Sequence, residues 1–104
     1  IFNKKDKMIE VYRKRRDLII DGLNSIRGIS CYMPKGSFYV FPNIKKLAKN
    51  SETVANELLE KANVITIPGS AFGSHGEGYL RMSYANSEEN LKEAVKRIKK
   101  YIEN

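Results

Sequence analysis

The sequence contains one cysteine, one histidine and no long apolar run. The single Cys31 excludes an intrachain disulfide and a metal site with several thiolates, and we expect it to be a strand residue. His75 lies in a glycine-rich loop with no second ligand at metal spacing, so we expect a solvated side chain and no metal site. No apolar segment approaches the roughly 20 residues needed to cross a bilayer, so we predict neither a membrane span nor a secretory signal.

Negative charge is scarce relative to positive charge, and the formal net charge is +7. Such an excess can indicate a nucleic-acid partner. The basic clusters at Arg13–Arg16, Lys45–Lys49 and Lys96–Lys100 belong to separate predicted elements, and no aromatic residues alternate with them as in a base-stacking surface. We interpret the clusters as solvated helix faces and predict no nucleic-acid partner.

Three segments of the 104-residue chain carry apolar residues at helical spacing. The first contains Met8 and Ile26, and Gly28 is placed to end it. The second begins at Ser51 and the third at Ser87, because serine is a favoured N-cap. The stripe of the last helix is expected to pack against that of the first on one side of the sheet: Leu91, Val95, Ile98 and Ile102 with Met8, Tyr12, Ile19 and Leu23.

Four short segments have β-type composition, at residues 29–33, 37–41, 63–68 and 79–85. The first two are separated by Pro34-Lys35-Gly36, which predicts a hairpin or a tight corner. The expected fold class is α/β in the α+β sense. It is a two-layer sandwich in which three helices cover a small mixed or antiparallel sheet of about four strands. We treat residues 1–104 as a single domain, and the strand order stays open.

The segment PGSAFGSHGEG, residues 68–78, has the glycine content of a phosphate-binding loop. No Gly-Lys-Ser/Thr follows it, however, and it leads into a strand where a phosphate-binding loop would lead into a helix. We interpret it as a structural loop. The sequence shows neither paired carboxylates of catalytic type nor a nucleophile beside a histidine.

Arg81 lies within the predicted strand YLRMSYA. Alternation places Leu80 and Met82 on the core side and Arg81 on the opposite, more polar side. Its planar fork of donors suits a carboxylate or a phosphate, although an ordinary exposed arginine has the same pattern.

The segments PKGSFYVFPNI and VITIPGSAFGSHGEGYLRMSYANSEENL resemble, in order and spacing, the C-terminal small domain of class I and II aminotransferases of the aspartate aminotransferase superfamily. The resemblance extends over nearly the whole chain. It implies a pyridoxal-phosphate enzyme of fold type I in which Arg81 binds the substrate α-carboxylate. It also implies that Phe38 lines the active site with Tyr39 beside it, and that the loop 68–73 leads toward the substrate entrance.

The implied reaction of the intact enzyme is amino transfer between an amino acid and a 2-oxo acid, in a cytoplasmic homodimer. In this family the Schiff-base lysine and the cofactor phosphate site belong to a large domain, so we assign no catalytic and no cofactor-binding residue to this chain. The start at Ile1 without a methionine leads us to expect a piece of a longer protein, inactive alone. The alternatives are a pyridoxal-phosphate-dependent β-lyase or synthase of the same fold, and a non-catalytic basic binding module.

Overall fold

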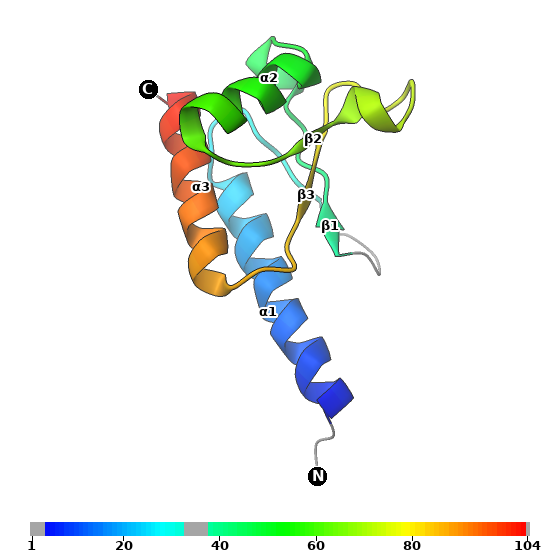
Figure 1. Ribbon diagram of the computed structural model, residues 1–104, viewed down its shortest axis with the longest axis vertical. Coiled ribbons are helices and arrows are strands. Elements are labelled where there is room, and N and C mark those ends of the chain that lie inside the picture. Colours follow the sequence, from blue (N-terminus) through cyan, green and yellow to red (C-terminus); the bar gives the residue numbers. More distant parts are fainter. Residues whose placement is uncertain (1–3, 33–37, 104) are drawn as a thin grey trace.

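The computed structural model describes residues 4–32 and 38–103, and it contains the three expected helices (Figure 1). The first, α1, spans Lys4–Asn24, α2 spans Ser51–Glu57, and α3 spans Glu88–Glu103. Among these helices, none combines the length and the apolar character that a membrane crossing requires.

Within the described residues the sheet has three short strands, β1 (Tyr39–Val40), β2 (Ile67–Pro68) and β3 (Leu80–Ser83). They lie in the order β1-β3-β2, and both pairings with the central strand β3 are antiparallel. The fold is therefore α+β, as predicted, with the antiparallel arrangement.

Three short helical segments connect these elements. The 3-10 helices η1 (Lys45–Leu47) and η3 (Gly69–Phe72) precede α2 and follow β2, respectively. The π-helical segment η2 (Leu58–Ala62) continues directly from α2, so the predicted second helix is present but changes its hydrogen-bond pattern in its last turn.

The predicted strand at 29–33 is not one of the three, and its described part forms only an isolated bridge between Ser30 and Asn43. The side chain of Asn24 explains this difference. Its amide nitrogen donates to the carbonyl of Cys31 and its oxygen accepts from the Cys31 N–H, both at 2.8 Å. The Cys31 backbone is thus paired with a side chain and not with a strand, and the expectation of a strand residue was wrong. The predicted corner at 34–36 lies outside the described residues.

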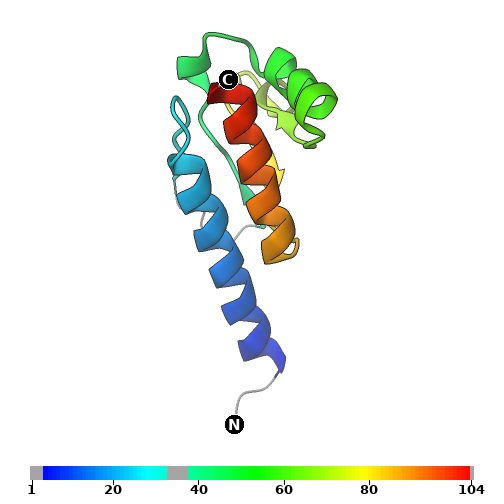
Figure 2. The same ribbon diagram turned by 90° about the vertical axis from the view of Figure 1, so that its left-hand side faces the viewer.

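Helices α1 and α3 lie side by side, with the strands behind them (Figure 2). Buried apolar side chains from all the main elements fill the space between the helices and the sheet. The largest of those that are almost fully buried are Ile19, Leu23, Ile26, Ile44, Leu58, Ile98, Val40 and Val54. The predicted packing of the first helix against the last is confirmed for Ile19 and Leu23 on α1 and for Leu91 and Ile98 on α3.

Met8 was expected in this core, but its side chain is 56% exposed, and Ile9 and Val11 are also exposed. The first turns of α1 extend beyond the end of α3, so in the described part of the chain this portion of the stripe has no helix to pack against (Figure 1). Helical periodicity predicted which face of α1 is apolar, but it carries no information on where the neighbouring helix ends.

The helix caps follow the expected chemistry with one correction. Ser87 Oγ accepts the N–H of Asn90 at 3.1 Å, which confirms it as the cap of α3. The cap of α2 is Asn50, whose side-chain oxygen accepts the N–H of Thr53 at 2.8 Å. Ser51, predicted for that role, is instead buried in the first turn of the helix.

Candidate functional site

Strand β3 presents two chemically different faces, as its alternation predicted. Leu80, Met82 and the following Tyr84 are buried, whereas Ser83 is exposed and Arg81 is partly exposed. The first set faces the core and holds the strand in place. Arg81 is consequently fixed at its Cα by the core while its side chain lies on the open face of the sheet.

The side chain of Arg81 lies over the ring of Tyr39, with Cζ 4.5 Å from the ring centroid. Sheet register causes this contact, because Tyr39 pairs with Ser83 and therefore lies diagonally from Arg81 on the same face. A guanidinium over an aromatic ring is stabilised by about 0.5–2 kcal/mol, and the planar group is held in one orientation.

Arg81 has no counter-ion among the described residues. The ion pairs found there join Arg16 to Asp17, Lys49 to Glu57 and Arg97 to Glu93, so none includes Arg81. Its Nε atom is buried and has no hydrogen-bond partner. A half-buried cation with an unsatisfied buried donor is unfavourable until an anion reaches it, so this position suits a carboxylate or phosphate from outside the chain.

Phe38 has different surroundings from Arg81 and Tyr39. Its ring centroid is 4.9 Å from that of Tyr12 on α1 and 6.3 Å from that of the buried Tyr84. The side chain is 54% exposed, at the edge of the helix-facing layer. Of the three residues predicted for the site, the structure brings Arg81 and Tyr39 together and places Phe38 against α1.

Two phenylalanines that the motif analysis did not select also lie beside the open face. Phe41 and Phe72 meet edge to face, with centroids 5.7 Å apart, and both rings are partly exposed. Alternation along β1 places Phe41 on the same side as Tyr39, and this was the signal in the sequence that could have identified it. Ile67 on β2 pairs with Arg81 on β3, so the guanidinium has apolar neighbours.

The glycine-rich loop connects β2 to β3 through close backbone contacts. A Cβ atom on Gly69 would lie 1.7 Å from the carbonyl oxygen of Gly76, so no larger residue fits there. Glu77 attaches the loop to α2, since its carboxylate accepts from the Ser51 N–H at 2.9 Å and from the Ser51 hydroxyl at 3.1 Å. Hydrogen bonds from the backbone N–H groups of Ser51 and Gly78 lower the pKa of Glu77. These contacts support the interpretation of a structural loop, and His75 within it is exposed, as expected.

The thiol of Cys31 is buried, and burial raises its pKa to about 11. At neutral pH it is therefore protonated and is not a candidate nucleophile.

The described residues around Arg81 do not fit pyridoxal phosphate by themselves. The cofactor needs an amine for covalent attachment and donors for its phosphate. Tyr39 stacks on Arg81 and Ile67 pairs across from it, and neither supplies an amine. The geometry supports binding of an anionic group and provides no covalent step.

Comparison with known proteins identifies the family. The family profile of aminotransferase class I and II matches residues 3–98. The chain is 49% identical over 98 residues to aspartate aminotransferase of Pyrococcus horikoshii, covering 94% of this chain and 25% of that protein. It is 41% identical over 97 residues to aromatic-amino-acid aminotransferase 2 of Thermococcus litoralis, covering 93% of this chain and 25% of the relative.

Solved structures agree with the sequence comparison. The crystal structure of aromatic aminotransferase from Pyrococcus horikoshii OT3 superposes with a TM-score of 0.90 at 37% identity, covering 97% of this chain and 28% of that chain. The chain thus spans about a quarter of the length of the curated relatives that it matches. The chain belongs to the class I and II aminotransferases, within the superfamily of pyridoxal-phosphate-dependent enzymes of fold type I.

Proposed function

We propose that this chain is the C-terminal small domain of a pyridoxal-phosphate-dependent aminotransferase, and that Arg81 binds the α-carboxylate of the amino-acid or 2-oxo-acid substrate. The observation that carries the proposal is the half-buried guanidinium of Arg81, whose buried Nε has no hydrogen-bond partner and which pairs with no carboxylate within residues 4–32 and 38–103. A substrate carboxylate has the charge and the two oxygens that a guanidinium fork accepts.

Tyr39 supports this role by holding the guanidinium plane. Because the ring lies 4.5 Å from Cζ, it limits the rotation of the side chain, so less conformational entropy is lost when the substrate binds. Tyr39 and Phe38 are proposed as further substrate-binding residues, with Phe38 acting from the neighbouring edge of the sheet. The loop 68–73, which includes Phe72, borders the same face at the proposed substrate entrance.

In this proposal the large domain lies outside residues 1–104 and binds the cofactor, and the intact enzyme is a homodimer. The chain itself positions the substrate carboxylate and helps to exclude water from the reacting atoms. Relatives whose names specify aspartate or aromatic amino-acid aminotransferases favour amino transfer over the β-lyase or synthase reaction. A screen of amino donors and 2-oxo-acid acceptors distinguishes these reactions.

The test of the carboxylate role is to replace Arg81 in the longer enzyme that contains this chain. Arg81→Ala removes two charge-assisted hydrogen bonds, so we expect kcat/KM for α-amino acids to fall by about a hundredfold or more. Arg81→Lys is expected to fail as well, because an ammonium group lacks the planar fork. Both kcat and KM are measured, since lost positioning lowers turnover as well as affinity.

Arg27→Ala is the matched control, because Arg27 is exposed and its hydrogen bond to Glu103 is donated by the backbone N–H, which the substitution keeps. Its kinetics should equal those of the wild-type enzyme. Near-normal efficiency of Arg81→Ala would contradict the carboxylate role. A large loss of thermal stability in Arg81→Ala would instead indicate that the guanidinium binds an anion of the protein itself.

A further inference from the structure

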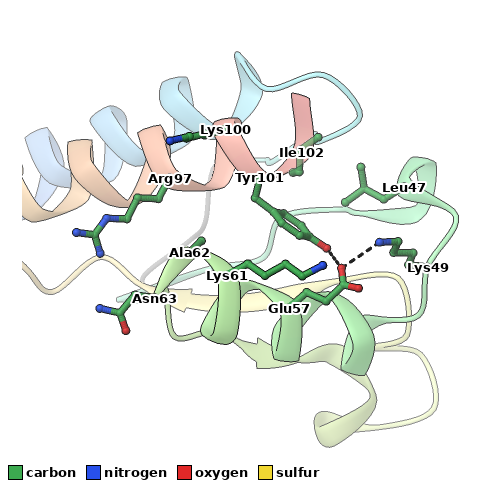
Figure 3. A pocket seen from close by; sticks show the side chains of 10 residues that line it. All are labelled: Leu47, Lys49, Glu57, Lys61, Ala62, Asn63, Arg97, Lys100, Tyr101 and Ile102. Atoms are coloured by element: carbon green, nitrogen blue, oxygen red, sulfur yellow. Dashed lines mark hydrogen bonds and ion pairs between the residues drawn. The ribbon is translucent and has the colours of Figure 1, made fainter. Parts of the chain in front are cut away.

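The cleft between η2 and the last turns of α3 has a volume of about 780 Å³, but its charged side chains do not converge (Figure 3). Lys49 Nζ lies 3.0 Å from Glu57 Oε2, so these two groups neutralise each other. Lys61 extends toward the same carboxylate, whereas Arg97 extends toward the opposite end of the cleft and pairs with Glu93 at 3.1 Å. We therefore assign no ligand to this cleft.

The open face of the sheet differs from this cleft, because the strand register determines what surrounds Arg81. Val40 on β1 pairs with Met82 on β3, and the two strands are antiparallel. The next residue along the chain, Phe41, therefore lies opposite Arg81. A backbone hydrogen bond and an isolated bridge farther along the same two segments keep this register. Opposed side chains of an antiparallel pair lie on one face with Cβ atoms about 4.5–5.5 Å apart, so Phe41 borders the Arg81 side chain.

Aliphatic side chains border Arg81 on the other side. Ile67 on β2 pairs with Arg81 directly. Val64 and Thr66 are buried, whereas Ile65 is 77% exposed. Alternation thus places Ile65 on the same open face as Ile67. The cation is therefore flanked by an aromatic ring on one side and by isoleucines on the other.

Phe72 extends this apolar surface from the glycine-rich loop. Its ring meets that of Phe41 edge to face, with centroids 5.7 Å apart, and both side chains are partly exposed. The helical segment η3, which carries Phe72, is fixed to β3 without a ligand, since the Gly69 N–H donates to the Tyr79 carbonyl at 2.8 Å. The two rings therefore form a preformed wall beside Arg81.

The described side chains that flank Arg81 on this face are uncharged. Across both strands and along β3 they are Tyr39, Phe41, Ile65, Ile67, Tyr79 and Ser83. Lys45 lies at the Tyr79 end of this group, with Nζ 4.9 Å from the ring centroid of Tyr79. A second carboxylate placed beside Phe41 and Ile67 would lose its hydration without gaining a partner, whereas an apolar group would bury carbon surface there.

We propose that Phe41 is a specificity-determining residue, and that the surface formed by Phe41, Phe72 and Ile67 binds the side chain of an aromatic or bulky aliphatic amino acid. The inference rests on the proposed function, because the carboxylate bound by Arg81 fixes the position of the substrate. The substrate side chain starts on the carbon atom next to that carboxylate, so it lies close to the residues that border the guanidinium. Phe41 contacts the substrate through its ring and takes no part in the chemical step.

The test compares amino donors in the longer enzyme that contains this chain. We measure kcat/KM for phenylalanine, leucine, alanine and aspartate with the wild-type enzyme and with Phe41→Ala. The wild-type enzyme should prefer phenylalanine and leucine to both alanine and aspartate. Phe41→Ala should lower kcat/KM for phenylalanine and leucine by about tenfold or more and leave the alanine value within about twofold, because contacts with the larger side chains are lost.

Further variants identify the type of contact. Phe41→Leu should recover most of the efficiency with leucine, since it restores an apolar side chain of similar reach. Phe72→Ala should weaken the same preference for phenylalanine and leucine. Leu59→Ala is the matched control, because Leu59 is an apolar side chain of η2 that is 49% exposed and lies outside the sheet. Its donor preference should equal that of the wild-type enzyme, and Tm values confirm that each variant is folded.

Arg81→Ala and Phe41→Ala distinguish the two proposals. If Arg81→Ala keeps normal efficiency, the carboxylate role is wrong, and the assignment of Phe41 fails with it. If Arg81→Ala loses activity with every donor while Phe41→Ala lowers all donors equally or none of them, only the assignment of Phe41 is wrong. A wild-type enzyme with a higher kcat/KM for aspartate than for phenylalanine and leucine would also overturn that assignment.

Discussion

The packing of α3 against α1 can be tested by replacing Ile98, whose side chain is 1% exposed in the core cluster. Ile98→Ala shortens this side chain without adding polar atoms or changing the helix propensity unfavourably. The loss of stability then reports how completely the site is buried.

The magnitude follows from the groups removed. Ile98→Ala deletes about three buried methyl or methylene groups, each worth about 0.8 kcal/mol of transfer free energy. The cavity adds a further cost, so we expect the free energy of unfolding to fall by about 2.5–5 kcal/mol. Because small domains are stable by only about 5–15 kcal/mol, this is a large fraction of the total.

The assay is reversible unfolding by urea and by heat, monitored by circular dichroism. For a domain of this size a loss of 1 kcal/mol lowers Tm by about 4–8 °C, so Ile98→Ala should lower Tm by at least about 10 °C. Met8→Ala is the matched control, because the exposed Met8 side chain should change stability by no more than about 0.5 kcal/mol.

A loss below about 1 kcal/mol for Ile98→Ala would show that the helix stripe is not buried as described. A loss for Met8→Ala as large as that for Ile98→Ala would show that the first turns of α1 have a packing partner. Either result would refute the present account of the helical layer.

Three further predictions concern the loop and the isolated chain. Gly69→Ala should destabilise the protein by about 1–3 kcal/mol, because its Cβ would collide with the backbone of Gly76; an unchanged urea midpoint would contradict this close contact. The folded-state pKa of Glu77 is below its ordinary value of 4.5, so its hydrogen bonds with Ser51 and Gly78 stabilise the fold above that pH. This contribution is lost as the pH falls through the lowered pKa, and Glu77→Gln should reduce the acid dependence of unfolding; equal pH profiles for the two proteins would argue against it. The 104-residue chain alone should show no amino transfer and no pyridoxal phosphate attached to one defined lysine after borohydride reduction, as measured by mass spectrometry; stoichiometric attachment at a single site would overturn this expectation.

Much of the fold follows from patterns between residues that are close in the sequence. Helical spacing identified the faces of α1 and α3, and strict alternation separated Arg81 from Leu80 and Met82 on β3. These patterns are readable because the 3.6-residue and two-residue periods assign side chains to faces whatever the partner is. The motifs around Arg81 also sufficed to predict the family.

Contacts between distant residues depended on the tertiary structure. Asn24 and Cys31 show this for the sheet, because a side-chain amide took the place of a strand partner that β-type composition had predicted. The cap of α2 is Asn50 and not the predicted Ser51, and the reason is again a contact between distant residues. Ser51 is bonded to Glu77, 26 residues further along the chain, and periodicity does not contain such a contact.

The candidate site shows the same division. The sequence by itself determined that Arg81 lies on the open face of a strand, since this depends only on alternation. Its stacking on Tyr39 and the position of Phe38 against Tyr12 were decided by the tertiary structure. The physical reason is that sheet register and helix packing set which distant side chains meet, and both result from burial of the whole core and not from any local segment.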